Sequence, residues 1–243
     1  MSDKTHINWT EATWNPWHGC IKVSPGCKNC YMYREKERYG QDPRVVVRSK
    51  TKFGDPLRWK EGKLVFACSW SDWFIKEADA WRDEAWDVIR KTPQHTYQIL
   101  TKRPERIQEH LPRDWGEGWA NVWLGVSVES QDYAYRVDSL LGIPAALHFI
   151  SAEPLLAPVI FSTLVGIGWV ITGGESDPVN PRPMNPEWAM SIRDQCANYG
   201  IPYLHKQNGG NTKIDGEWGG RLLDGQIYDA IPVTRKQRKV GEE

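Results

Sequence analysis

The sequence lacks a long hydrophobic run, a surplus of charge of either sign and an apolar segment near its start. No stretch of about 18 apolar residues occurs, so we expect no transmembrane helix. Residues 1–10 are polar and contain nothing like the core of a secretory leader, so we expect a cytoplasmic protein. The chain has 31 Lys and Arg against 31 Asp and Glu, which excludes a general attraction to nucleic acids. Residues 234–239 are a basic exception, typical of a solvated terminus.

Cysteine is scarce and unevenly distributed. The chain has five cysteines, and an odd number without a secretory leader argues against a disulfide framework. Three of them, Cys20, Cys27 and Cys30, lie close together near the start. Cys68 lies in an apolar run and Cys196 in a helical stretch, so we expect both to be packed thiols.

Short apolar runs recur along the chain and indicate buried parallel strands. Helical periodicity separates several of them, as in residues 78–91 and 186–199. With a further strand before Cys20, this alternation predicts an α/β fold, a full or partial (β/α) barrel of about six to seven βα units. We place the barrel domain at residues 1–207 and a C-terminal extension at residues 208–243. The apolar runs are residues 64–68, 96–100, 122–126, 147–150, 169–172 and 202–205.

Polar and charged residues follow the predicted strands with unusual regularity. In a (β/α) barrel the carboxyl ends of the strands meet at one rim, where active sites lie. Helix caps and turns explain such residues one at a time, but not the whole set. We therefore predict that the set binds a ligand or substrate. Its members are Ser69, Asp72, Lys102, Arg103, Ser127, Glu129, Glu153, Gly173, Gly174, Glu175, Lys206 and Gln207.

The clustered cysteines have the spacing of a metal-binding loop. They follow the pattern C-x6-C-x2-C, and nearby glycines and a proline allow the loop to fold back. Thiolates select iron–sulfur clusters, zinc or copper(I). Three cysteines leave one iron of a [4Fe-4S] cluster free to bind a small molecule, whereas four would close the site. A structural zinc ion held by the three cysteines and His18 is the alternative.

Several short blocks accompany the cysteine cluster along the chain. They are residues 9–16 (WTEATWNP), 100–106 (LTKRPER), 123–129 (WLGVSVE), 173–176 (GGES), 182–184 (RPM), 193–196 (RDQC) and 206–207 (KQ). Together with the cysteines, these blocks resemble the phage-associated three-cysteine family described as a domain of unknown function. The resemblance extends from about residue 8 to residue 210. That family is in turn similar to a divergent branch of the radical S-adenosylmethionine enzymes.

The resemblance implies a radical-SAM-like partial barrel with a [4Fe-4S] cluster on the three cysteines and S-adenosyl-L-methionine at its open iron. The chain departs from the usual C-x3-C-x2-C spacing, and its Gly-Gly-Glu motif follows a late strand instead of the second. Cofactor binding is expected from Ser69, Asp72, Ser127, Glu129, Gly173, Gly174 and Glu175. Substrate binding is expected from Lys102, Arg103, Glu153, Lys206 and Gln207.

The same resemblance implies an isomerase that rearranges an amino-acid-modified thymidine in phage DNA, with a flavodoxin-type electron donor. The alternatives are a radical enzyme for a small molecule or peptide, and a zinc-stabilised nucleic-acid-binding module without catalysis. If the substrate is a nucleotide, Trp14, Trp17, Trp70 and Trp73 could stack on its base. The alternative for each of them is core filling between the helices and the barrel. A base inside duplex DNA would have to be flipped out.

Overall fold

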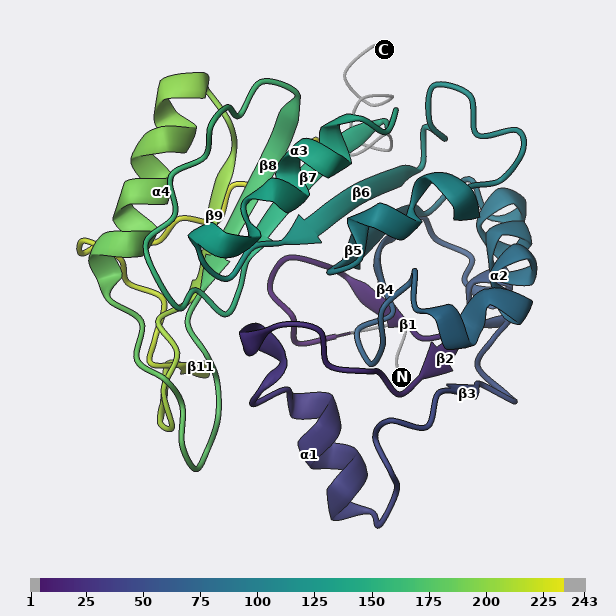
Figure 1. The fold of residues 1–243 in the computed structure, drawn as a ribbon, viewed down its shortest axis with the longest axis horizontal. Helices are drawn as coiled ribbons and strands as arrows, with labels where there is room; N and C mark the ends of the chain where they lie inside the picture. The colour runs from purple at the N-terminus through teal and green to yellow at the C-terminus, as the bar shows by residue number, and fades with distance from the viewer. Residues whose placement is uncertain (1–4, 234–243) are drawn as a thin grey trace.

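The computed structural model describes residues 5–233, so the basic residues 234–239 lie outside the described part. Seven parallel strands of this part form one curved sheet, and their spatial order follows the chain (Figure 1). β1 and β9 are the edges of the sheet and do not pair, so the sheet is a half-barrel. The predicted α/β architecture is therefore confirmed in its partial form. The strands are β1 (Ala12–Trp14), β4 (Leu64–Ala67), β5 (Thr96–Thr101), β6 (Val122–Ser127), β7 (Leu147–Ala152), β8 (Ile167–Gly173) and β9 (Tyr203–Gln207).

The strands are nearly continuous apolar runs because both faces of the sheet are covered. Every residue of β4 and β6 is buried. All six predicted runs are strands, with ends that differ by one or two residues. β4 stops before Cys68, which adopts a left-handed backbone conformation with φ of 59°. Two short antiparallel pairs complete the strands of the described residues. They are β2 (Trp17–His18) with β3 (Val47–Arg48), and β10 (Lys213–Ile214) with β11 (Glu217–Trp218).

α3 and α4 lie on the outer face of the curved sheet, whereas α1 lies apart from the sheet (Figure 1). α3 packs against β6 and β7, and α4 packs against β8 and β9. α4 begins as predicted, with Pro186 in its first turn and the side chain of Asn185 accepting a hydrogen bond from the Glu187 N–H. It ends at Gly200, whose φ of 65° suits glycine. The α-helices are α1 (Tyr31–Arg38), α2 (Asp79–Lys91), α3 (Tyr135–Leu141) and α4 (Pro186–Tyr199).

A helix does not follow every strand, which corrects the expectation of regular βα units. β5 is followed only by short 3-10 turns, and β7 is followed by no helix. Prolines explain both gaps, because proline lacks the N–H that a helix interior needs. Pro104 and Pro112 follow β5, and Pro154 and Pro158 follow β7. The 3-10 turns of the described chain are η1 (Pro25–Cys27), η2 (Asp55–Arg58), η3 (Lys76–Ala78), η4 (Pro104–Arg106), η5 (Gln108–His110) and η6 (Gln131–Tyr133).

None of the helices in residues 5–233 is long and apolar enough to cross a membrane.

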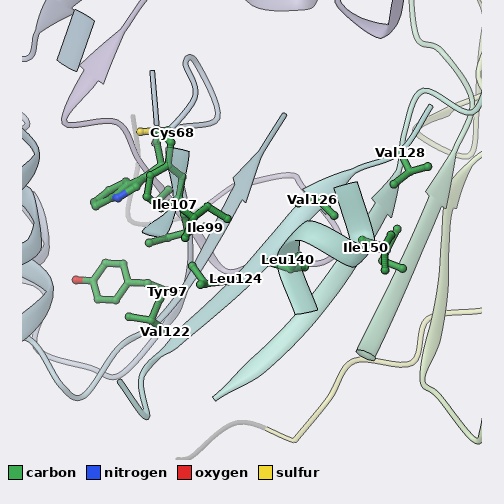
Figure 2. Close-up of a cluster of buried hydrophobic side chains, with 14 of the residues drawn as sticks. Cys68, Tyr97, Ile99, Ile107, Val122, Leu124, Val126, Val128, Leu140 and Ile150 are labelled. Carbon is green, nitrogen blue, oxygen red and sulfur yellow. The ribbon is translucent and has the colours of Figure 1, made fainter. Parts of the chain in front are cut away.

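The larger hydrophobic core lies between the sheet and its outer helices (Figure 2). Alternate residues of the strands point into it, as the two-residue period of a strand requires. Ile99 of β5, Leu124 and Val126 of β6 and Ile150 of β7 are all fully buried. Leu140 of α3 packs in the same cluster. This layer anchors the helices to the sheet.

The intervening residues fill the concave side of the sheet with a second, smaller core, called the floor below. Gly125 of β6 is in register with Phe149 of β7, and Phe149 with Trp169 of β8. A Cβ on Gly125 would lie 2.4 Å from the Phe149 ring, so glycine is required for this ring to enter the interior. The floor consists of Trp9, Leu64, Phe66, Trp123, Phe149, Trp169, Ile171 and Leu204.

The described part of the C-terminal extension packs along β9. The Tyr228 carbonyl accepts a hydrogen bond of 2.8 Å from the His205 N–H, and Asp229 forms an antiparallel bridge with Leu204. The Trp169 indole N–H donates to the Ala230 carbonyl at 2.8 Å. The extension therefore covers the free edge of the last strand.

Candidate functional site

A cavity of about 440 Å³ opens at the carboxyl end of the half-barrel, where the sequence predicts the site. Cys20, Cys27 and Cys30 all line it. Nine of the predicted strand-end residues also line it, namely Ser69, Asp72, Lys102, Arg103, Ser127, Glu153, Gly174, Glu175 and Lys206. Glu129, Gly173 and Gln207 do not line it. The sequence therefore predicts the lining well, and the three exceptions need separate explanations.

The cysteine loop (residues 19–30) is built on backbone contacts with neighbouring loops. Gly19 has a φ of 98°, and a Cβ there would lie 2.3 Å from the Val45 carbonyl oxygen, so only glycine fits. The Cys20 N–H donates to the Pro43 carbonyl at 2.9 Å. The Tyr33 hydroxyl, from α1, donates to the Cys20 carbonyl at 2.6 Å. These contacts fix the first cysteine relative to α1 and to the segment that leads to β3.

The other two cysteines belong to regular turns. The η1 turn contains Cys27, whose N–H donates to the Ser24 carbonyl at 3.0 Å. Cys30 is the residue immediately before α1, and its carbonyl accepts from the Tyr33 N–H at 3.1 Å. The free N–H groups of a helix start favour an anion beside them. The start of α1 therefore favours the thiolate form of Cys30, in opposition to burial.

Charged side chains at the rim compete with burial in setting the state of the thiols. Burial raises the pKa of Cys20 to about 12, Asp72 adds to the rise, and Arg103 opposes it. Burial also raises the pKa of Cys30, whereas the N–H groups of α1 and the ammonium of Lys102 lower it. Metal ligands are thiolates, so both cations favour the state that a metal centre requires.

The three cysteines are not arranged around a single ion. Among residues 5–233, no group of three or more His, Cys, Asp or Glu side chains is placed to hold one metal ion. His18, the fourth ligand of the alternative zinc set, does not line the cavity. The cysteines of an iron–sulfur cluster bind different irons and do not need to meet at one point. Three cysteine side chains that border one cavity are donors that such a cluster could use.

Asp72 and Arg103 tie the first part of the cysteine loop to β5. Arg103 Nη1 lies 3.0 Å from Asp72 Oδ2, and both side chains are buried. Arg103 Nη2 donates to the Ile21 carbonyl at 2.8 Å. Asp72 also accepts hydrogen bonds from the Thr101 hydroxyl at 2.7 Å and the Lys102 N–H at 2.9 Å. The pair thus joins the loop after β4, the end of β5 and the cysteine loop.

Glu129 follows β6 and is completely buried. Its carboxylate lies 3.2 Å from Lys102 Nζ and 2.8 Å from Arg136 Nη1. Burial alone would raise the pKa of Glu129, but these two cations outweigh it and hold the pKa below its ordinary value. A buried carboxylate with two cationic partners is stably ionised.

Glu175 is the corresponding carboxylate after β8. Arg182 contacts both of its oxygens, and the Asn29 side chain donates to Oε2 at 2.8 Å. Burial alone would raise the pKa of Glu175, but the hydrogen bonds from Arg182 and Asn29 outweigh it and hold the pKa below its ordinary value. Glu175 borders the cavity, yet its oxygens are engaged by protein groups.

Glu153 and Lys206 form an ion pair on the cavity wall, after β7 and on β9. Both side chains are about one-fifth exposed, so the pair faces the cavity and stays accessible to a ligand. Gly173 supports it, because a Cβ there would press against the Glu153 side chain at 3.2 Å. The Gln207 amide donates to the Gly174 carbonyl at 3.1 Å and holds the ends of β8 and β9 together.

Three of the four tryptophans considered for base stacking are not exposed to the cavity. Trp14, Trp17 and Trp73 are buried in the outer core, with 1% or less of each exposed. They pack against one another and against further aromatic rings, which accounts for part of the high tryptophan content. Trp70 is partly exposed and lines the cavity.

Sequence reasoning missed several residues that support the site. Ser24 and Asn29 lie between the cysteines and contact distant carboxylates, and Tyr31 lines the cavity beside Cys30. The position of Ser24 and Asn29 inside the cysteine loop, and of Tyr31 directly after it, is a signal that could have found them. Arg136 and Arg182 each lie seven residues after the carboxylate that they contact, Glu129 and Glu175, and this spacing is a local signal that the sequence reasoning did not use. Cys68 and Cys196 are buried, as predicted, and Cys68 also borders the cavity.

These features define a parallel α/β half-barrel protein with a three-cysteine loop at its rim. A family model described as "Protein of unknown function (DUF5131)" matches residues 4–232, which is nearly the whole chain. The chain belongs to this family. No curated protein and no solved structure matches it. The match confirms the resemblance to a domain of unknown function, while the link to phages and to radical enzymes stays a prediction.

Proposed function

We propose that the protein is a radical S-adenosylmethionine enzyme that holds a [4Fe-4S] cluster on Cys20, Cys27 and Cys30. One observation carries the proposal: all three cysteines line a single cavity at the carboxyl-end rim of a parallel half-barrel. The rim is the face on which barrel enzymes carry their chemistry. A ligand set of three thiolates would leave one iron free for S-adenosylmethionine.

Bound and reduced, such a cluster supplies an electron that cleaves the sulfur–carbon bond of S-adenosylmethionine and releases a 5′-deoxyadenosyl radical for hydrogen abstraction. The residues of the chain would bind and shield the reactants. Trp9, Phe66 and Leu100 give the cavity an apolar base that excludes water. Glu153 and Lys206 offer one charge of each sign, and Ser127 adds a hydroxyl.

We further propose an isomerase acting on an amino-acid-modified thymidine in DNA. The Glu153–Lys206 pair supports this substrate, because an amino-acid adduct carries an amine for the carboxylate and a carboxylate for the ammonium. The uneven distribution of charge along the chain supports a polyanionic substrate such as DNA. Residues 20–63 contain twelve Lys and Arg against five Asp and Glu, a surplus of seven hidden by the neutral total. The first part of this segment lines the cavity, although none of its Lys or Arg side chains does, so its charge would act from outside the cavity.

Anaerobic reconstitution with iron and sulfide tests the cluster. We expect a brown protein with about four irons and four sulfides per chain, and S-adenosylmethionine-dependent 5′-deoxyadenosine after reduction. Cys27→Ala should lose the iron. Cys68→Ala and Cys196→Ala are matched controls that should keep it. A colourless protein with one zinc ion would overturn the proposal, and loss of iron in Cys68→Ala would mean a closed site with four cysteines.

Substrate competition tests the finer proposal. The reduced enzyme should form 5′-deoxyadenosine faster with DNA that carries amino-acid-modified thymidine than with unmodified DNA or with the free nucleoside. Adding salt should weaken the response to DNA, since phosphate contacts release counterions. Equal responses to all three additions would exclude a DNA substrate and leave the cluster assignment untouched.

A further inference from the structure

The cysteine loop is attached to the barrel by carboxylates at the ends of two strands far away in the sequence. Glu129 follows β6 and Glu175 follows β8, and both belong to the set predicted to bind the cofactor. Their hydrogen bonds indicate a different task. Each carboxylate receives a side chain from within the loop, and each is completed by an arginine from outside it.

Glu129 holds the middle of the loop. The Ser24 hydroxyl, three residues before Cys27, donates to Glu129 Oε1. Gly26 packs directly on the same side chain, because a Cβ on Gly26 would lie 2.4 Å from Glu129 Cγ. Lys102 forms an ion pair with the same Oε1, and Arg136 donates a hydrogen bond to Oε2. Both oxygens of Glu129 are therefore used by protein donors, and none faces the cavity.

Glu175 holds the far end of the loop. The amide of Asn29, between Cys27 and Cys30, donates to Glu175 Oε2 at 2.8 Å. Arg182 binds both Glu175 oxygens through its guanidinium and donates a further hydrogen bond of 3.0 Å to the Pro25 carbonyl. Glu175 and Arg182 together thus contact both sides of Cys27.

We propose that Glu129 and Glu175 are positioning residues that hold the cysteine loop in its metal-binding shape, and are not ligands of S-adenosylmethionine. An ionised carboxylate has about four acceptor positions. Glu129 uses three of them on Ser24, Lys102 and Arg136, and Glu175 uses four on Asn29 and Arg182, which leaves little or no capacity for a cationic amine. A loop anchored at two points loses less conformational freedom when it binds a metal centre. The part of this inference that concerns metal rests on the proposed function.

Two substitutions disturb the Glu129 anchor by independent routes. Glu129→Gln keeps the shape but removes the charge that Lys102 and Arg136 need. Gly26→Ala keeps every charge but forces the loop away from Glu129. Both should lower iron retention several-fold after desalting and broaden the EPR signal of the reduced protein before S-adenosylmethionine is added. Glu153→Gln, which changes a cavity carboxylate without a hydrogen bond to the loop, is the matched control and should keep iron and signal.

The EPR comparison separates positioning from cofactor binding. If Glu129 or Glu175 is a ligand of S-adenosylmethionine, Glu129→Gln and Glu175→Gln should keep full iron and an unchanged signal, and lose only the spectral shift caused by S-adenosylmethionine. That result would overturn the proposal. Rescue of iron content by Glu129→Asp, which restores the charge, would support it.

Hydrogen exchange of the metal-free protein makes the test independent of the proposed function. The amides of residues 20–30 should exchange at least about tenfold faster in Glu129→Gln and Gly26→Ala than in the unmodified chain, while the strands keep their protection. If the unmodified protein binds no iron, the proposed function fails, yet faster loop exchange would still establish the anchor. Unchanged exchange in both variants would refute the anchor even in a protein that binds iron.

Discussion

The floor and the rim of the concave face are built on the same strands but follow opposite rules. On β6 and β7 the inward-facing positions pass from Trp123 and Phe149 in the floor to Ser127 and Ser151 at the rim, where the two serines are in register. The floor is held by aromatic packing. The rim is held by ion pairs between carboxylates and cations. A few residues along each strand thus separate the part that stabilises the barrel from the part that organises the site.

The difference matters because the two kinds of contact respond to different changes. Aromatic packing is insensitive to charge and pH and depends on filled volume. Buried ion pairs depend on both partners, and removing one leaves a charge that burial makes costly. Substitutions in the floor should therefore change overall stability, whereas substitutions at the rim should change the order of the cysteine loop.

The largest expected effect is that of Trp169→Ala in the floor. Trp169 is fully buried and contacts the rings of Trp9, Trp123 and Phe149. Its removal leaves a large cavity and should lower the free energy of unfolding by about 3–5 kcal/mol. Urea unfolding followed by circular dichroism measures this loss. The folded fraction should still bind iron normally, and a parallel loss of iron would contradict the division between floor and rim.

An intermediate effect is expected of Gly125→Ala, which overfills the floor instead of emptying it. The added methyl group would lie 2.4 Å from the ring of Phe149, so that ring has to move. Overpacking of this kind costs about 1–3 kcal/mol. Gly142→Ala is the matched control, because its nearest neighbour would be 3.6 Å away. Equal melting temperatures of the two variants would show that the interior can relax around the ring.

The smallest effect on overall stability is expected from acid, which should act on the rim alone. Cationic and hydrogen-bonding partners hold the pKa values of Glu129 and Glu175 below the ordinary value of 4.5 despite burial. Their contribution is therefore complete above that value and is lost as the pH falls through the lower folded-state pKa. As the pH falls below 4.5 and through the lowered folded-state pKa values, the loop amides of residues 20–30 should lose protection before the floor strands do. Simultaneous loss in hydrogen exchange would contradict this order.

The sequence predicts the strands well because buried parallel strands are continuous apolar runs, whatever surrounds them. The two named helical stretches, residues 78–91 and 186–199, match α2 and α4, but the expected βα units after β5 and β7 lack their helices, because prolines follow these strands. The three-cysteine loop and most of the cavity lining are also predictable. The carboxyl end of a parallel strand reaches the rim whenever the strand itself is identified correctly.

The tasks of the individual rim residues are not predictable from local sequence. Glu129 meets Ser24 across 105 positions, and Glu175 meets Asn29 across 146. Whether a carboxylate faces the cavity or turns toward the loop depends on these distant partners. The position of the tryptophans is unpredictable for the same reason, since Trp14 and Trp73 are distant in sequence and contact each other only in the folded core. Residue type alone does not show whether a tryptophan stacks on a ligand or fills the core. It also does not show whether a carboxylate binds a ligand or holds the cysteine loop.

The path of the chain beyond β9 has a consequence for solubility. An open half-barrel has two edges, and a bare strand edge is a template for pairing with another chain. Residues 228 and 229 occupy hydrogen-bonding positions beside β9, and Ala230 caps the indole of Trp169. A protein shortened to the barrel strands would expose this row of backbone groups and an aromatic ring beside it. Residues 228–230 therefore cover backbone groups of β9 that would otherwise be open to pairing with another chain, at a place away from the cavity.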